Sequence, residues 1–317
     1  MHSALNRENR VRIPTTPIRR NFLKPICQKQ HKVNQSMLAT ATTLPLFSDW
    51  VDSLPNVLAV RTLKYVTQLI LQARQDNYPV IFAYGGHVVK TGCSPLIVDL
   101  IKRGIITAVV TNGSGAIHDI ELAMHGATSE DVDKELETGS YGMVSETMDF
   151  FMKSTVKGIR DGLGNAIGCY LGGSKYKSCS ILCAAYEYSL PATVHVAIGT
   201  DTVHMSPSLD GAALGASSLR DFRLLAQVAE HMNGGVWINA GSAVILPEVL
   251  LKVVSMARNK GIEFDSLNTV NFDMHKHYRT SQNVLTRPVR KGNGHQIIGH
   301  HEINLPLLRQ MIVAGGH

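Results

Sequence analysis

The sequence is poor in aromatic and charged residues, and it has no long hydrophobic run. Aromatic residues make up 6% and charged residues 18% of its 317 positions, whereas hydrophobic residues make up 44%. No stretch reaches the roughly 18 consecutive apolar residues that a membrane-spanning helix needs. We therefore expect no membrane association, and the length and apolar share suit a large α/β domain.

The sequence also lacks the common signatures of metal sites and serine hydrolases. Its cysteines form no paired metal-binding motif, and neither His-Glu-x-x-His nor a clear two-histidine-one-carboxylate spacing is present. No Gly-x-Ser-x-Gly occurs with the partners of a catalytic triad. We expect no metal. An odd number of cysteines without a clear secretion signal predicts reduced thiols and a cytoplasmic protein; the five are Cys27, Cys93, Cys169, Cys179 and Cys183.

Positive charge is concentrated near the N-terminus. Residues 1–48 hold eight basic residues and one acidic residue, which gives this stretch a net charge of +7. The whole chain has a net charge of +6, so the remaining residues together carry −1. A nearly neutral body predicts no nucleic-acid partner. Residues 1–45 are polar and basic and have no hydrophobic periodicity, which predicts a disordered basic extension. We expect residues 46–317 to form a single domain. The alternatives are an organelle transit peptide or a start codon misplaced upstream of Met37.

One stretch predicts a complete strand–helix–strand unit. Val80 to Tyr84 is an uninterrupted apolar run, typical of a strand buried on both faces of a parallel sheet. A helix over 94–104 follows, with proline in its first turn, and a second buried strand spans 105–110. Both strands lead into small residues, at Gly85-Gly86 and at 112–115. Ligands of open α/β sheets bind at such carboxyl ends of strands.

The remainder repeats this alternation. Segment 158–173 carries six glycines, which we interpret as a mobile or functional connection. No internal repeat or second domain is evident, so we predict an α/β protein with a doubly wound, mainly parallel sheet. The further expected helices are 54–76, 117–125, 180–188, 219–231 and 247–259, with another entered from 140–147, and the further strands are 191–198, 235–239 and a last clear strand at 266–272.

Three small-residue turns suggest phosphate binding. Gly86–Gly92 precedes the helix at 94–104, and similar turns occur at 112–115 and 241–242. Small residues let backbone N–H groups approach a phosphate, and a following helix presents its positive end. The first turn is neither Gly-x-Gly-x-x-Gly nor a P-loop, so the three turns together, rather than one motif, carry this prediction.

Acid–base candidates follow the same strands. His118 and Asp119 come after the second turn, Asp201 and His204 come after the strand at 191–198, and Asp210 lies in the loop beyond. A histidine pair followed by a glutamate comes near the end of the chain. Because carboxyl ends of parallel strands meet at one edge of a sheet, we expect these groups to gather there. The residues of the last set are His300, His301 and Glu302.

These residues belong to strings that resemble the deoxyhypusine synthase family, over about residues 54–308. The closest match is its bacterial deoxyhypusine synthase-like branch. The second string is also similar to the NAD-binding domain of archaeal and cyanobacterial ornithine cyclodeaminases. The strings are HVVKTGCSPLIVDLIKRG, TNGSGAIHDIE with GATSEDV, VHVAIGTDTVHMSPSLDGAALG, GSAVILPEV, NTVNFD and GHHEINLPLL.

The resemblance implies an NAD-binding, Rossmann-like fold that assembles into homotetramers with active sites between subunits. It also implies which residues contact NAD. They are Gly86, His87, Lys90, Thr91, Gly92, Asn112, Gly113, Ser114, Asp210, Gly241, Ser242, Asn268, Thr269, His300 and His301.

The sequence departs from the family where the synthases carry a nucleophilic lysine in a Trp-Gly-Lys string. Residues 286–292 read Thr-Arg-Pro-Val-Arg-Lys-Gly here. Arginine stays protonated and cannot form an imine, which leaves Lys291 as the candidate in this region. The family's polyamine-contacting histidine, which follows the third glycine turn, falls on or near Pro247, and the family's acidic residue just after the Asp-Gly loop falls near Ala216.

We therefore expect an NAD-dependent transferase or lyase that acts on the C–N bond of a small amine or amino acid, through dehydrogenation to an imine and then transfer or elimination. His118 is the first candidate for general acid–base catalysis, with Asp119 orienting it. His204 and Glu302 are second candidates. Two alternatives stay open: a true deoxyhypusine synthase with a displaced lysine, and a non-catalytic NAD-binding protein.

Overall fold

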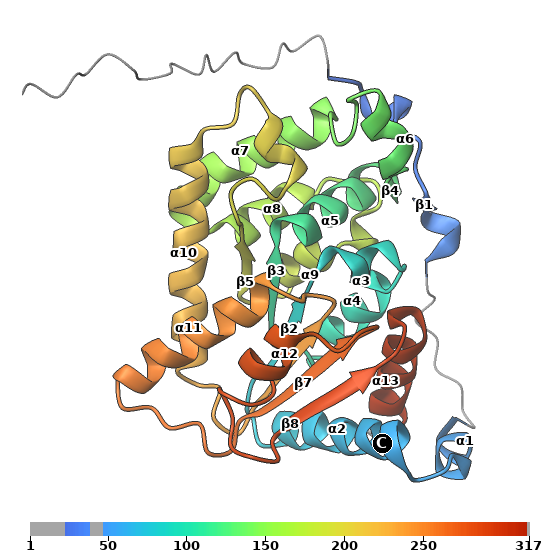
Figure 1. Ribbon diagram of the computed structural model, residues 1–317, viewed down its shortest axis with the longest axis vertical. Coiled ribbons are helices and arrows are strands. Elements are labelled where there is room, and N and C mark those ends of the chain that lie inside the picture. The colour runs from blue at the N-terminus through green and yellow to red at the C-terminus, as the bar shows by residue number, and fades with distance from the viewer. Residues whose placement is uncertain (1–22, 39–46, 316–317) are drawn as a thin grey trace, which may run out of the picture.

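A six-stranded parallel sheet forms the centre of the molecule (Figure 1). The computed structural model describes residues 23–38 and 47–315. The spatial order is β5-β3-β2-β6-β7-β8, and every neighbouring pair is parallel. This is the doubly wound order in which the chain starts in the middle of the sheet and reverses direction between β2 and β6, so the predicted fold class is confirmed. The strands are β2 Val80–Tyr84, β3 Ala108–Asn112, β5 Ala192–His195, β6 Val236–Ala240, β7 Asn268–Asp273 and β8 Gly294–Ile298.

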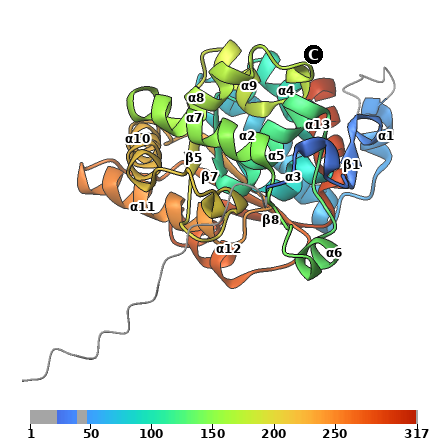
Figure 2. The same cartoon turned by 90° about the horizontal axis from the view of Figure 1, so that it is seen from above.

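Helices cover both faces of the sheet (Figures 1 and 2). No helix among the described residues is long and apolar enough to cross a membrane. The helices are α1 Phe47–Ser53, α2 Leu58–Gln75, α3 Gly86–Lys90, α4 Ser94–Lys102, α5 Gly113–His125, α6 Val132–Glu137, α7 Ser145–Asp161, α8 Leu163–Leu171, α9 Ile181–Glu187, α10 Gly211–Ala229, α11 Ile245–Asn259, α12 Tyr278–Asn283 and α13 His301–Gly315.

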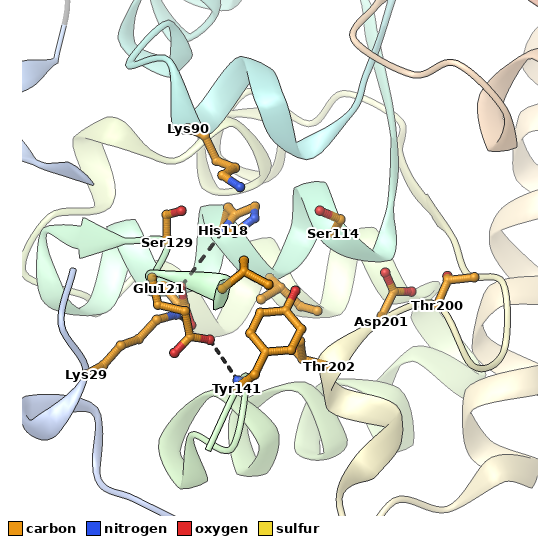
Figure 3. Close-up of a pocket in the computed structure, with 14 residues that line it drawn as sticks. Lys29, Lys90, Ser114, His118, Glu121, Ser129, Tyr141, Thr200, Asp201 and Thr202 are labelled. Carbon is orange, nitrogen blue, oxygen red and sulfur yellow. Dashed lines mark hydrogen bonds and ion pairs between the residues drawn. The ribbon is translucent and has the colours of Figure 1, made fainter. Parts of the chain in front are cut away.

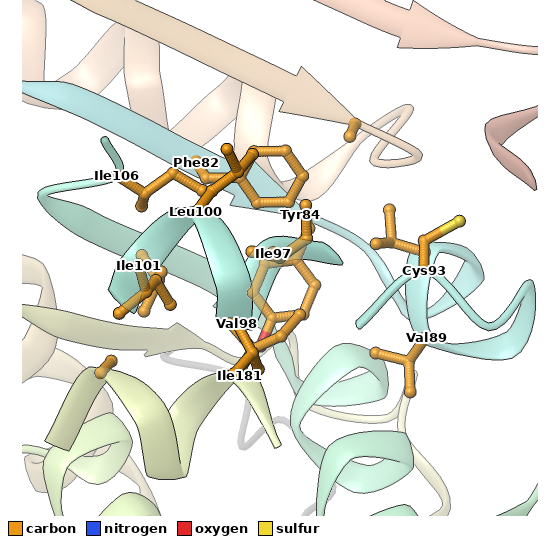
Figure 4. Packing of buried hydrophobic residues seen from close by; sticks show 14 of the residues in the cluster. Phe82, Tyr84, Val89, Cys93, Ile97, Val98, Leu100, Ile101, Ile106 and Ile181 are labelled. Atoms are coloured by element: carbon orange, nitrogen blue, oxygen red, sulfur yellow. The ribbon is translucent and has the colours of Figure 1, made fainter. Parts of the chain in front are cut away.

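The alternation of side chains along the strands produces two cores. In β2, Phe82 and Tyr84 pack into one core with α2, α4, α9 and α13, whereas Ile81 and Ala83 face the other with α10 and α11. Successive strand residues point to opposite faces, so the uninterrupted apolar run seen in the sequence is what a strand covered on both sides needs. Figure 4 shows Phe82 and Tyr84 meeting Ile97 of α4 in the first core.

Several predicted boundaries differ from those observed. The turns at 86–92 and 112–115 are largely the first turns of helices α3 and α5. The predicted connection at 158–173 is wrong, because it comprises the end of α7 and helix α8. Its glycines serve close packing: a Cβ on Gly164 would lie 2.3 Å from the carbonyl oxygen of Ala192.

Strand β8 follows the strand expected to be last. It lies at the edge of the sheet next to β7, and among its residues only Ile297 is buried. An edge strand needs no uninterrupted apolar run. The residues GHQII therefore show no pattern from which a strand could be predicted.

The segment 23–38 packs on the body of the protein. Strand β1 (Val33–Asn34) pairs antiparallel with β4 (Ala127–Thr128), and the short 3₁₀ helix η2 (Ile26–Gln28) precedes it. The predicted disorder of residues 1–45 is therefore wrong for 23–38, and the rest of that stretch lies outside the described residues. The segment is held by individual charged side chains and backbone hydrogen bonds, which leave no apolar period in the sequence.

Candidate active site

A polar cavity of about 130 Å³ lies where β2, β3 and β5 end (Figure 3). Lys90 comes from α3 after β2, His118 and Glu121 come from α5 after β3, and Asp201 follows β5. Lys29 and Glu130 complete its charged lining, from the N-terminal segment and the connection after β4. The cavity is thus at the edge of the sheet predicted from the sequence, and it brings charges of both signs around one histidine.

His118 is held through a threonine by a carboxylate. Its Nδ1 lies 2.8 Å from Oγ1 of Thr128, and this hydroxyl donates to Oε2 of Glu121 over 2.6 Å. Burial alone would raise the pKa of Glu121, but contact with His118 and the charge of Lys29 hold it well below its usual range. Glu121 is therefore ionised and can only accept.

This arrangement determines which nitrogen of His118 carries the proton. Since the hydrogen of Thr128 goes to Glu121, the Thr128 oxygen must accept one from Nδ1–H of His118. Burial lowers the pKa of His118, against the opposing effect of Glu121, so the ring is neutral near pH 7 and its Nε2 has a free lone pair. Such a nitrogen can act as a general base.

Lys29 balances the charge of Glu121. Its Nζ lies 2.6 Å from Oε1, and the two side chains are only 4% and 2% exposed. Thr147 contacts the same oxygen at 3.3 Å, so both carboxylate oxygens have partners. Sequence analysis missed Lys29 and Glu121. The spacing of three residues between His118 and Glu121 on one helix is the signal that could have identified the latter.

The prediction that Asp119 orients His118 is wrong. Asp119 is fully buried and accepts hydrogen bonds from the Ser180 hydroxyl at 2.5 Å and from the backbone N–H groups of Ile181 and Leu182. Burial raises its pKa to about 6, against the lowering effect of these bonds. Consecutive residues of a helix do not share a face, so Asp119 ties α5 to the start of α9 instead.

Asp201 faces the cavity and His204 does not line it. The Asp201 carboxylate accepts from the backbone N–H of Ser114, and its Oδ2 is buried without a hydrogen-bond partner among the described residues. Burial raises its pKa to about 6. A Cβ on Gly113 would lie 2.0 Å from this Oδ2. His204 accepts from the backbone N–H of Asp201 and of Gly199 through Nδ1, which stabilises its own turn.

A second group of predicted residues meets between β2 and β6, where the strand order reverses. A Cβ on Gly86 would lie 2.4 Å from Oγ of Ser114, and one on Gly241 would lie 2.9 Å from Nε2 of His301. The rings of His87 and His301 are 5.5 Å apart, and Nδ1 of His301 is buried without a partner among the residues described. The two glycines let these side chains pack directly on the backbone at the point of an open α/β sheet where dinucleotides bind.

Other predicted cofactor contacts have structural partners. The Thr91 hydroxyl donates to the carbonyl oxygen of His87 at 2.9 Å. Gly92 has φ of +75° and faces the carbonyl of Met37. Asp210 is the exposed N-cap of α10, where its Oδ1 accepts from Ala212.

Two more predicted positions accept hydrogen bonds from backbone N–H groups in the first turn of a helix. Asn112 caps α5 through Gly115 at 2.9 Å. The Ser242 hydroxyl accepts from the backbone N–H of Leu246 at 3.2 Å.

Asn268 and Thr269 lie at the wrong end of their strand for the predicted role. They begin β7, and Thr269 is buried with its hydroxyl donating to the carbonyl oxygen of Val284 at 2.6 Å. The carboxyl end of β7 is Asp273, about 16 Å away at 3.3 Å per residue. The prediction of cofactor contact is therefore wrong for this pair.

The remaining candidates near the C-terminus are exposed. His300 and Glu302 approach each other at 3.6 Å at the start of α13, and neither lines the cavity. Lys291 is exposed and precedes the amino end of β8. Because the strands are parallel, that end lies on the edge of the sheet opposite the cavity.

Comparison with known proteins supports the fold. No protein-family model matches the chain, and no curated protein sequence matches it. Among solved structures, AgrE in complex with ornithine and NAD⁺ is 14% identical with a TM-score of 0.51, over 81% of this chain and 34% of AgrE. A putative LOR/SDH protein of Methanococcus maripaludis S2 is 14% identical with a TM-score of 0.53, over 81% and 70% of the two chains.

A third similar structure is ArgZ, a cyanobacterial arginine dihydrolase of the ornithine-ammonia cycle. It is 13% identical with a TM-score of 0.51, over 79% of this chain and 32% of ArgZ. The chain thus spans about a third of the length of AgrE and of ArgZ. At this identity the likeness concerns the fold alone, and the doubly wound, Rossmann-like α/β fold expected from the sequence is confirmed.

Proposed function

We propose that this chain is an NAD-dependent enzyme that oxidises the C–N bond of a small amine or amino acid to an imine, followed by transfer or elimination. The observation that carries the proposal is the neutral His118, which uses Nδ1 to contact Thr128 and lines a polar cavity at the carboxyl edge of a doubly wound sheet. A cavity of about 130 Å³ favours a substrate of few heavy atoms.

The residues at the reversal point fit a dinucleotide. Gly86 packs against Ser114 and Gly241 packs against His301, and Nδ1 of His301 offers a buried polar atom without a partner in the described chain. AgrE, which shares the fold, has been solved with NAD⁺. We expect Gly86, His87, Ser114, Gly241 and His301 to hold NAD⁺, which would supply the hydride acceptor.

The chain's own groups would bind the substrate and move a proton. Forming C=N from a C–N bond removes a hydride from carbon and a proton from nitrogen, and Nε2 of His118 is positioned to take the proton. Lys90 forms no ion pair among the described residues and points toward His118 (Figure 3), while the carboxylate of Asp201 lines the same cavity. A zwitterion with its carboxylate at Lys90 and its ammonium at Asp201 would match these charges.

The two alternatives differ in what they require. A true deoxyhypusine synthase needs a buried, uncharged lysine at the site, and Lys291 is exposed at the opposite edge of the sheet. A non-catalytic NAD-binding protein has no need of an oriented His118. Homotetrameric assembly, a cytoplasmic location and the absence of a nucleic-acid partner stay predictions from the sequence.

The proposal is tested with the purified full chain. NAD⁺ binding is measured by calorimetry, and NADH and ammonia are monitored with a panel of small amines and α-amino acids. We expect turnover of at least one compound, and a loss of about 100-fold in His118→Ala, within the usual range for a general base. His231→Ala, at an exposed histidine after α10, is the matched control. Absence of NAD⁺ binding at millimolar concentration would overturn the proposal.

A further inference from the structure

We propose that Lys29 is a positioning residue of this site, which acts through Glu121 and Thr128 to keep the proton of His118 on Nδ1 and the lone pair on Nε2. The inference rests on the proposed function, because it assigns a device that prepares the proposed base. It also makes the N-terminal segment 23–38 part of the active site.

The contact between Lys29 and Glu121 is close and dry. The ammonium of Lys29 reaches Oε1 of Glu121 over 2.6 Å, and both side chains are almost fully buried. Removing one partner of such a pair leaves an uncompensated charge and is strongly unfavourable. No other acidic side chain forms a hydrogen bond or ion pair with Lys29 among the described residues, so its charge is directed at Glu121.

The same piece of structure supplies Lys29 and Thr128. Lys29 directly follows η2, four residues before Val33 of β1, and Val33 is paired directly with Thr128 of β4. Thr128 in turn bridges Glu121 and His118. The β1–β4 ribbon therefore joins the positive charge and the bridging hydroxyl in one unit.

The direction of the hydrogen bonds depends on the charge of Glu121. While Glu121 is ionised, Thr128 must donate to it and accept from Nδ1–H of His118. A protonated Glu121 could donate to Thr128, which would then donate to Nδ1 and move the ring proton to Nε2. Lys29 prevents this reversal, because its charge favours the ionised carboxylate.

The alternative outcome of losing Lys29 is a cationic His118. The charged groups that face the ring are Glu121 from its own helix, Lys90 from α3 and Lys29 from the N-terminal segment. Without Lys29 the negative charge of Glu121 beside the ring would be less compensated, and the pKa of His118 would rise. Glu130, Tyr141 and Asp201 line the same cavity. Either outcome removes the free lone pair from Nε2 at neutral pH.

The test reads the tautomer directly and requires no substrate. Nitrogen-15-labelled histidine in the full chain is observed at pH 7 by two-bond proton–nitrogen NMR, with the His118 signals identified from His118→Gln. We expect wild type and Lys29→Arg to show the neutral Nδ1–H form. In Lys29→Met the population of the neutral Nδ1–H form of His118, relative to its other protonation and tautomeric forms, should fall by about tenfold, equivalent to one pKa unit.

A matched control separates this effect from a general effect of the segment. Lys32→Met removes a lysine three positions away, whose partner Asp131 is exposed and 3.0 Å distant, and it should leave the His118 spectrum unchanged. Because Lys29→Met could unfold the protein, Thr128→Val is measured as well. It keeps the Lys29–Glu121 pair but interrupts the bridge, and it should lose the Nδ1–H preference.

The results distinguish this inference from the proposed function. A folded Lys29→Met that retains the Nδ1–H form would overturn the positioning role, and so would a wild-type-like spectrum of Thr128→Val if Lys29→Met does not fold. Absence of NAD⁺ binding or turnover in wild type would overturn the proposed function while leaving the tautomer result intact.

Discussion

Nδ1 of His118 lies 2.8 Å from Oγ1 of Thr128, although ten residues separate them in the sequence. Helix α5 carries the histidine, and the short strand β4 that follows turns back to present the threonine. The hydroxyl continues to Glu121. A general base prepared in this way needs a hydroxyl that accepts from one side and donates to the other.

Thr128→Val is therefore expected to reduce both turnover and stability. Valine keeps the shape but neither accepts from His118 nor donates to Glu121, and loss of one buried hydrogen-bonding partner costs about 1–3 kcal/mol. We expect kcat to fall at least tenfold with little change in KM. Thr62→Val is the control, since Thr62 is half-exposed, lies outside the cavity, and donates to the carbonyl oxygen of Leu58 in its own helix. Equal effects of the two substitutions on kcat would contradict the bridging role.

Activity should increase with pH through the pKa of His118 and then level off. The base is active in its unprotonated form, and burial lowers the pKa of His118 from its ordinary value near 6.5. The acid limb of kcat/KM is thus expected below pH 6.5. The profile is measured with the substrate found in the screen, and a limb above pH 7 would show that His118 is charged at neutrality or is not the base.

The sequence predicted the centre of the fold well, because its signals are local. The apolar run of β2 and the small residues after β2, β3 and β6 needed no knowledge of distant contacts. The site was harder to predict. His118 was identified from its place after a strand, but its partners Thr128 and Lys29 depend on the pairing of β1 with β4, and two-residue strands leave no periodic pattern.

Two errors show the limit of reasoning from neighbouring positions. Asp119 is adjacent to His118 in the chain, yet it points into the interface with α9. Asn268 and Thr269 belong to the string NTVNFD, which resembles the deoxyhypusine synthase family, yet they begin β7 instead of ending it. In both cases the position of the residue along the chain left open which way its side chain points or at which end of a strand it lies, and the three-dimensional structure was needed to decide this.

Gly86→Ala should impair NAD⁺ binding and His118 together. The new Cβ would lie 2.4 Å from Oγ of Ser114 and 2.8 Å from Cδ2 of His118, and such overpacking costs about 1–3 kcal/mol. Gly215→Ala is the matched control, because a Cβ there meets nothing within 4 Å in the middle of α10. Calorimetry with NAD⁺ and thermal unfolding compare the two variants, and unchanged affinity in Gly86→Ala would remove this glycine from the cofactor site.

Asp221 should make stability depend on pH. It is buried, accepts from the backbone N–H groups of Gly164 and Val194, and has its pKa raised by burial to about 7 from 3.8. A raised folded-state pKa means that its stabilising contribution is complete below pH 3.8 and is lost as pH rises toward 7.

The loss is on the order of 3–4 kcal/mol for a shift of this size. Asp221→Asn does not titrate, so its Tm relative to wild type should become more favourable between pH 4 and pH 7.5. A Tm difference that is constant or moves the other way would contradict the raised pKa. Asp133→Asn is a suitable control, since Asp133 is exposed in α6.

The last prediction separates the two enzyme hypotheses. A covalent imine with spermidine requires an uncharged lysine amine, produced by burial that lowers its pKa. Lys291 is exposed before β8, at the edge opposite the cavity, so no adduct is expected there. The protein is incubated with NAD⁺ and spermidine, reduced with borohydride, and weighed intact, with Lys291→Ala as the paired variant. A mass increase in wild type that disappears in Lys291→Ala would restore the synthase mechanism. An adduct that persists in Lys291→Ala and maps to Lys90 would instead make this lysine of the cavity lining the nucleophile.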